Sequence, residues 1–215
     1  MESNSRSLSK GLWDGQQELA RQCLHHPFVR GILTGDIPEE SFRYYVSQDA
    51  LYLRSFARAY LLAAARCPDW NGFCTFHELA GGALRELELH ESYAERWDVA
   101  QSELQPAAST RQYTDFLLAT AWGTDTGTTA AAMAPCMRLY AYLGRSLMAE
   151  AGRLPDHQYA EWIETYADNE FEALASTLEQ LVDRYVTDEA SARSAYRYAM
   201  QCELAFFEAA HRCAR

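Results

Sequence analysis

Apolar side chains recur along most of the chain at the three- and four-residue spacing that marks one face of an α-helix. The clearest stripe lies between residues 42 and 60, and similar stripes run through residues 133–144 and 196–210. Runs of β-branched residues with strand-like alternation are scarce. The pattern therefore predicts an all-α protein, a helical bundle of seven to nine helices.

Glycine, proline and capping residues indicate where these helices begin and end. A short helical turn is expected between Pro27 and Gly35, and longer helices over residues 9–25, 37–66, 72–103, 110–122, 128–151, 157–166, 169–186 and 188–212. The expected N-terminal caps are Asp36 (with Glu39 three residues on), Ser109, Asp156 and Thr187. No repeat, low-complexity segment or linker interrupts the pattern, so residues 1–215 are predicted to form a single domain.

The charge of the chain argues against one class of partner. The net charge is −11 at pH 7 and there is no basic run, whereas a nucleic-acid-binding protein needs a positive surface. Residues 1–10 lack the apolar core of a signal peptide, and no apolar run approaches the roughly 18 residues of a membrane span. We expect a cytoplasmic protein with no membrane or nucleic-acid partner, whose six cysteines are free thiols.

Three polar residues stand at the centre of otherwise apolar helix faces. Asp49 lies within the stripe of residues 42–60, Cys136 within residues 133–144 and Glu203 within residues 196–210. Each has a structural interpretation: the carboxylates can be buried in ion pairs or hydrogen bonds, and a cysteine on a core face is usually only packing. Because an unpartnered buried carboxylate is costly, a functional interpretation competes with the structural one.

The three faces together suggest a binding site. If they converge, the core contains a pocket with a thiol, two carboxylates and aromatic walls, which suits a flat ring that carries nitrogen atoms. Cys136 is then the candidate nucleophile, and Pro135 directly before it would open the helix by removing one hydrogen bond. The sequence does not identify the base that would activate the thiol.

Other candidates are weaker. Tyr113 and Tyr166 fall on inward-facing positions, where they are either core or site residues. Glu86, Glu88 and His90 have the composition of a metal site, but residues two apart point to different sides of a helix. The spacing favours a solvated helix face, and we predict no metal site and no cofactor.

Four segments, in order along the chain, resemble the signatures of the TenA proteins, which are known as thiaminase II and have a haem-oxygenase-like fold. Residues 26–53 contain a His-Pro-Phe entry and a Tyr-x-x-Gln-Asp motif. The other three segments are "APCMRLY", "WIETYADNEF" and "CELAFFEAA". The similarity runs over nearly the whole chain.

The resemblance implies a function and a role for each matching position. Family members hydrolyse an aminomethyl pyrimidine, a degradation product of thiamin, to hydroxymethyl pyrimidine for salvage, and they also cleave thiamin. Cys136 matches the catalytic nucleophile, Glu203 the proton-handling glutamate and Asp49 the aspartate that binds the ring nitrogens. The matching pocket residues are Tyr52, Tyr113, Tyr140, Tyr166, Phe206 and Phe207. The family uses neither metal nor haem and is typically homotetrameric.

One departure and two alternative functions stay open. Phe207 stands where a tryptophan is frequent in the family, which can alter the shape of the pocket. A haem- or metal-dependent oxidase of the same fold would need inward-facing histidine or carboxylate ligands, of which the sequence offers few. A non-catalytic pyrimidine-binding regulator would bind the ring without turnover.

Overall fold

The computed structural model describes residues 7–96 and 105–213, and the side chains of residues 88–96 lie outside the description. All regular structure in these ranges is helical, which confirms the predicted all-α class. The helices are α1 (Leu8–Asp14), α2 (Gln17–Leu24), α3 (Pro27–Thr34), α4 (Glu39–Arg66), α5 (Trp70–Arg96), α6 (Ala108–Gly123), α7 (Thr126–Ala151), α8 (Ala160–Ala167), α9 (Asn169–Tyr185) and α10 (Glu189–Arg212). None of these described helices is both long and apolar enough to cross a membrane.

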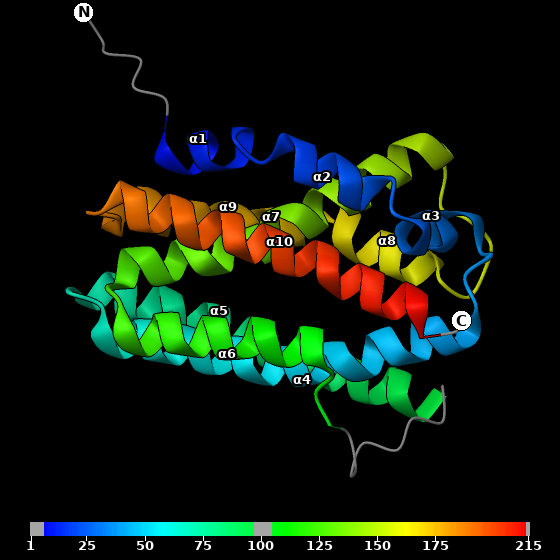
Figure 1. Ribbon diagram of the computed structural model, residues 1–215, viewed down its shortest axis with the longest axis horizontal. Helices are drawn as coiled ribbons and strands as arrows, with labels where there is room; N and C mark the ends of the chain where they lie inside the picture. Colours follow the sequence, from blue (N-terminus) through cyan, green and yellow to red (C-terminus); the bar gives the residue numbers. More distant parts are fainter. Residues whose placement is uncertain (1–6, 97–104, 214–215) are drawn as a thin grey trace, which may run out of the picture.

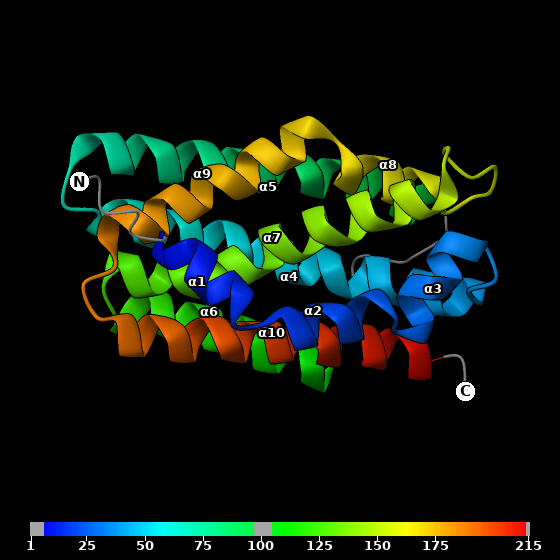
Figure 2. The ribbon, with the colours of Figure 1, turned by 90° about the horizontal axis from the view of Figure 1, so that it is seen from above.

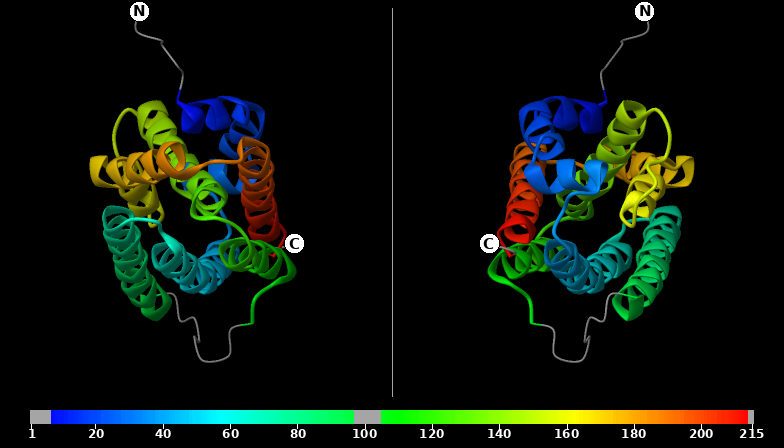
Figure 3. Two further views of the ribbon diagram at one scale, coloured as in Figure 1. Left: turned by 90° about the vertical axis from the view of Figure 1, so that its left-hand side faces the viewer. Right: turned by 90° about the vertical axis from the view of Figure 1, so that its right-hand side faces the viewer.

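The long helices pack around α7. Helix α4 packs between α5 and α6, and α7 contacts α4, α6, α8, α9 and α10 (Figure 1). The short helices α1 and α2 run over α7 and α10 on the face opposite α4 (Figure 2). Viewed end-on, the helices form a ring around a central core (Figure 3). Apolar stripes of α4, α7 and α10 therefore face one another across the core.

Most predicted helix ends lie within a few residues of the observed ends, with one clear exception. The helix expected over residues 9–25 is divided into α1 and α2 at Gly15 and Gln16, which is why the described residues form ten helices rather than seven to nine. The C-terminus of α3 behaves as expected, because Gly35 takes the left-handed conformation at φ 78°. The predicted continuation of α5 beyond Arg96 falls on residues outside the description.

The predicted N-caps were wrong at all four positions. Helix α4 follows Pro38 without a side-chain cap, α6 follows Ala107, and α8 follows Tyr159. The last helix is capped by Asp188, one residue after Thr187, because the aspartate side chain accepts hydrogen bonds from the N–H groups of Ala190 and Ser191.

The segment that leads into α6 is instead held by a residue from another helix. Gln48 Oε1 accepts hydrogen bonds from the N–H of Ala107 at 2.9 Å and from the hydroxyl of Thr110 at 2.7 Å, and its amide donates to the carbonyl of Gln105 at 3.2 Å. Gln48 is buried and directly precedes Asp49. The Tyr-x-x-Gln-Asp motif thus fixes α6 against α4 beside one of the candidate site residues.

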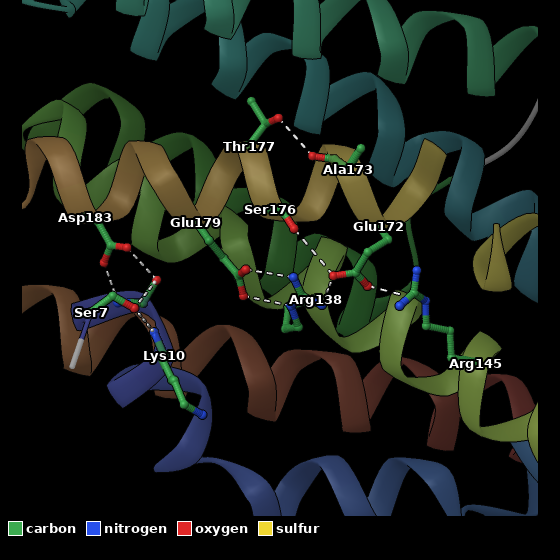
Figure 4. Close-up of polar contacts among 11 residues, drawn as sticks. Ser7, Lys10, Arg138, Arg145, Glu172, Ala173, Ser176, Thr177, Glu179 and Asp183 are labelled. Atoms are coloured by element: carbon green, nitrogen blue, oxygen red, sulfur yellow. Dashed lines mark hydrogen bonds and ion pairs between the residues drawn. The ribbon is translucent and has the colours of Figure 1, made fainter. Parts of the chain in front are cut away.

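Helix α7 is held from two further sides. Arg138, two residues after Cys136, donates two hydrogen bonds to Glu179 and one to Glu172, all at 2.7 Å (Figure 4). Residues two apart point to different sides of a helix, so this cluster binds α7 to α9 away from the thiol. At Gly144, an added Cβ would lie 2.3 Å from the backbone of Tyr166, so only glycine lets α8 cross this closely.

Candidate active site

The faces of α4, α7 and α10 that carry Asp49, Cys136 and Glu203 converge on one buried cavity. Its lining consists of seven side chains from four helices: Asp49, Tyr52, Tyr113, Cys136, Tyr140, Glu203 and Phe206. The cavity encloses about 170 Å³ of empty space between its side chains, but that space has room for at most about one water molecule. The side chains therefore fill most of the volume that a bound ring would need.

Glu203 is the most deeply buried carboxylate of the cavity, with 2% of its surface exposed. The hydroxyl of Tyr113 donates a hydrogen bond of 2.8 Å to its Oε1 atom. Burial raises the pKa of Glu203 to about 8, and the negative charge of Asp49 adds to the rise, while hydrogen bonds from Tyr113 and Cys136 oppose it. Glu203 is thus mostly protonated at neutral pH and is able to exchange a proton near pH 8.

The Cys136 thiol faces Glu203 and the hydroxyl of Tyr52. Burial raises the pKa of the thiol well above its ordinary value, and the charge of Glu203 raises it further, while Tyr52 lowers it. The thiol is therefore protonated in the cavity at neutral pH. Glu203 lies within hydrogen-bonding reach, and its ionised form, whose population grows as the pH rises toward 8, can accept the thiol proton, a role for which the sequence offered no candidate.

Asp49 gives the cavity a second acidic group. It is 6% exposed, and its charge contributes to the raised pKa values of Glu203, Cys136 and Tyr140. Two carboxyl groups facing one small cavity favour a ligand with N–H donors or a positive charge.

Aromatic rings form most of the remaining wall, in two layers. Tyr52 lies with its ring centroid 4.8 Å from Tyr113 and 6.4 Å from Phe206. Tyr140 lines the cavity as well. Tyr166 and Phe207 lie behind the Tyr140 ring, with their ring centroids 4.8 and 5.8 Å from its centroid. These two residues support the wall rather than line the cavity.

Two supporting residues were missed in the sequence. The Trp162 indole N–H donates to the hydroxyl of Tyr45 at 3.1 Å, which donates to the hydroxyl of Tyr140 at 3.2 Å. The chain of bonds fixes the Tyr140 ring at the cavity. Tyr45 stands in the stripe of α4 and Trp162 lies one turn before Tyr166, so helical spacing alone would have placed both on inward faces.

Glu86, which the sequence analysis considered only as a metal ligand or a solvated residue, is a third supporting residue. The side chain is half-buried, and its Oε1 accepts a hydrogen bond of 3.0 Å from the hydroxyl of Tyr166. The side chains of Glu88 and His90 lie outside the described residues. Within the ranges that the structure describes, no group of three or more histidine, cysteine or acidic residues is arranged to hold a metal ion.

A known protein-family model matches nearly the whole chain. The model described as the TENA/THI-4/PQQC family matches residues 13–213, a range that contains all seven cavity residues. The chain belongs to this family. The resemblance of the four sequence segments to TenA proteins is thereby confirmed.

Relatives of the TenA family carry names that describe an activity. The "Aminopyrimidine aminohydrolase" of Halalkalibacterium halodurans is 34% identical over 181 residues, 82% of this chain and 81% of that protein. The "Bifunctional TH2 protein, mitochondrial" of Arabidopsis thaliana is 32% identical over 221 residues, 88% of this chain. The chain spans only 35% of the length of that plant protein. As a member of the TenA family, this protein is a hydrolase of the thiaminase II type.

Solved structures show the same fold. The TenA homologue protein from P. horikoshii OT3 superposes with a TM-score of 0.89 at 25% identity, covering 97% of this chain and 100% of that one. Haem oxygenase-1 from the cyanobacterium Synechocystis sp. PCC6803 superposes with a TM-score of 0.63 at 19% identity, covering 95% and 92%. The second likeness concerns the fold alone, and it confirms the predicted haem-oxygenase-like architecture of this TenA chain.

Proposed function

We propose that the protein hydrolyses 4-amino-5-aminomethyl-2-methylpyrimidine to the hydroxymethyl pyrimidine, and that it also cleaves thiamin, with Cys136 as the nucleophile. The observation that carries the proposal is the single cavity that gathers a thiol, two carboxyl groups and aromatic rings. The name "Aminopyrimidine aminohydrolase" of several relatives supports an aminopyrimidine as the substrate class. The name "Thiamine biosynthesis multifunctional protein ThiED" of a relative from Corynebacterium efficiens supports thiamin metabolism as the setting.

Substrate binding uses the acidic and aromatic parts of the cavity. Asp49 accepts hydrogen bonds from the amino group and a protonated ring nitrogen of the pyrimidine. Tyr52, Tyr140 and Phe206 contact the ring. Because the empty cavity is so small, the ring enters only when these side chains move apart.

The first half of the reaction breaks the bond to the leaving group. Glu203 takes the thiol proton as Cys136 Sγ bonds to the ring carbon next to the carbon that carries the methylene group. The electrons of the double bond between this carbon and the ring nitrogen move onto the nitrogen, which is already protonated and is held by Asp49. The electron pair then returns to form an exocyclic double bond and expels the amine, which takes the proton from Glu203.

The second half restores the aromatic ring. A water molecule adds to the exocyclic methylene, and Glu203 takes one of its protons. The electron pair of the ring nitrogen expels Sγ from the ring carbon, which restores the protonated aromatic ring, and the thiolate takes its proton back from Glu203. Water is consumed and the amine is released, so the atoms balance without any oxidant or reductant.

The test replaces the nucleophile. Cys136→Ser should lower kcat for aminomethyl pyrimidine hydrolysis by about 10³-fold or more, because a serine hydroxyl is a far weaker nucleophile at this pH. Cys213→Ser is the matched control, since Cys213 is exposed at the end of α10. Near-normal turnover by Cys136→Ser would contradict the assignment, as would an equal loss in the control.

Assembly and location are part of the same proposal. We expect a homotetramer in the cytoplasm, which works without a metal or an organic cofactor. Light scattering after size exclusion measures the mass of the assembly. A monomeric mass at micromolar concentration would contradict the tetramer and leave the chemistry of the cavity untouched.

A further inference from the structure

The glutamine of the Tyr-x-x-Gln-Asp motif has no part in the reaction proposed above, although it makes three hydrogen bonds in the interior. Gln48 is 5% exposed and extends from α4 to the start of α6. Its Oε1 atom accepts from the N–H of Ala107 and the hydroxyl of Thr110, and its amide donates to the carbonyl of Gln105. Thr110 is completely buried, so water cannot take the place of the glutamine if it is lost. Gln48 therefore ties the first turn of α6 to α4.

This tie lies one helical turn before the partner of the catalytic carboxyl. Tyr113 follows Thr110 by three residues, so both side chains lie on the same side of α6. The hydroxyl of Tyr113 donates the 2.8 Å hydrogen bond to Glu203, and its ring centroid lies 4.8 Å from that of Tyr52 on α4. Helices α4 and α6, which run side by side (Figure 1), therefore meet twice in succession, first at Gln48 and then at Tyr52.

The bond between Tyr113 and Glu203 is sensitive to the position of α6. A side chain moves with the helical turn that carries it. A shift of about 1 Å at the start of α6 would lengthen the 2.8 Å bond beyond hydrogen-bonding range. The partner of the catalytic carboxyl thus depends on what holds the first turn of α6 in place.

Titratable groups of five helices surround the Glu203 carboxyl. They are Cys23 of α2, Asp49 and Tyr52 of α4, Tyr113 of α6, Cys136 and Tyr140 of α7, and Cys202 of α10. Among these groups, Tyr113 belongs to the helix that Gln48 ties. Its hydrogen bond lowers the pKa of Glu203 and so opposes the effect of burial.

We propose that Gln48 is a positioning residue for the reaction: by holding the first turn of α6 on α4, it places the hydroxyl of Tyr113 against Glu203. This inference rests on the proposed function, because the reaction gives Glu203 its role. Gln48 does not line the cavity and acts through Tyr113. Without Gln48, Glu203 is harder to ionise, and fewer molecules at a given pH hold the form that takes the thiol proton.

The experiment follows kcat/KM for aminomethyl pyrimidine against pH in Gln48→Met, Tyr113→Phe and the double variant. Methionine is about as long as glutamine but lacks the amide. On the acid side, kcat/KM rises as Glu203 ionises. This rise should move to higher pH by about one unit in both single variants, because a hydrogen bond to a charged group is worth roughly that much. The double variant should move no further, since both changes remove the same bond.

A gentler variant serves if Gln48→Met does not fold. Thr110→Val keeps the shape of the side chain and removes only its hydrogen bond to Gln48. The rise in kcat/KM should then move to higher pH by about 0.5 unit. An unmoved rise in this variant would in that case decide against the inference.

Arg66→Met is the matched control, because Arg66 ties the opposite end of α6 to α4. Its guanidinium donates to the carbonyls of Ala121, at 3.0 Å, and of Trp122. This end of α6 lies about two turns beyond Tyr113, so the rise should stay at the wild-type pH.

Three kinetic results would overturn the inference. A lower Tm in Gln48→Met with an unmoved pH profile would show a purely structural role. An equal movement in Arg66→Met would show that any loosening of α6 suffices. A further movement in the double variant would show that Gln48 acts by another path, such as its neighbour Asp49.

A titration that needs no turnover separates this inference from the proposed function. The probe is the carboxyl carbon of Glu203, labelled with ¹³C and identified by NMR from the signal that Glu203→Gln lacks. Its midpoint should lie near pH 8 in the wild-type protein and about one unit higher in Gln48→Met. A protein that hydrolyses neither aminomethyl pyrimidine nor thiamin would overturn the proposed function, and the titration would still decide the role of Gln48. Equal midpoints in the two proteins would overturn that role alone.

Discussion

Two sets of carboxylates flank α7, and the charge of their hydrogen-bond partners differs. Glu172 and Glu179 face Arg138, whose guanidinium gives them three hydrogen bonds of 2.7 Å (Figure 4). Glu203, on the other side of the helix, receives the neutral hydroxyl of Tyr113 and lies beside a thiol and Asp49. The first set is neutralised and binds two helices together. In the second set, burial disfavours the charged form of Glu203 and brings its pKa to about 8, which suits acid–base chemistry.

The largest expected effect follows from removing the carboxyl group of Glu203, which exchanges protons in the catalytic cavity. Glu203→Gln should lower kcat for aminopyrimidine hydrolysis by about 10²–10⁴-fold, because glutamine still accepts from Tyr113 but cannot take or give a proton. Steady-state kinetics at pH 8 measures the change. A loss smaller than about threefold would show that Glu203 only shapes the cavity.

The same variant tests the cost of burying Glu203. Its pKa is about 8 in the folded protein and near 4.5 in the unfolded chain, so the folded state binds more protons between these values. The contribution of Glu203 to stability is therefore fully present below pH 4.5 and is lost as pH rises to 8, by on the order of 4 kcal/mol. Denaturant unfolding at pH 5 and pH 9 should show that Glu203→Gln gains stability relative to wild type at pH 9. A constant difference between the two proteins would contradict the raised pKa.

A smaller effect is expected on the neutralised side of α7. Arg138→Met keeps an apolar stem but leaves Glu172 and Glu179 without the guanidinium, at a cost of about 2 kcal/mol in the free energy of unfolding. The catalytic groups are untouched, so kcat should change far less than in Glu203→Gln. Lys10→Met is the control, because the Lys10–Asp14 pair is exposed. Equal destabilisation by Arg138→Met and Lys10→Met would contradict a special stabilising role for the Arg138 cluster.

Periodicity predicted the parts of the molecule that depend on neighbouring turns of one helix. The ends of α7, the inward faces of α4 and α10, and the positions of Asp49 and Glu203 on those faces could all be read from spacing. Partners between helices could not. Ser109 has good capping chemistry, but α6 begins one residue earlier, where Gln48 from α4 accepts from Ala107 N–H and the Thr110 hydroxyl. Glu86 looked like a surface residue because nothing near it in sequence reveals the hydroxyl of Tyr166.

The roles of the site residues lie beyond both periodicity and geometry. Spacing placed Tyr166 and Phe207 on the inward face of their helices, but it could not distinguish a residue that touches the cavity from one packed behind Tyr140. That distinction depends on ring positions of a few ångströms, which are set by the crossing of α8 at Gly144. The kinetic variants above decide the roles.

The small volume of the catalytic cavity has a consequence for the rate at which substrate arrives. Aromatic side chains that already pack against one another must separate before a ring can enter, so only a fraction of collisions with the protein succeed. Association is then set by the frequency with which Tyr52, Tyr113 and Phe206 part, and it falls below the limit for free encounter.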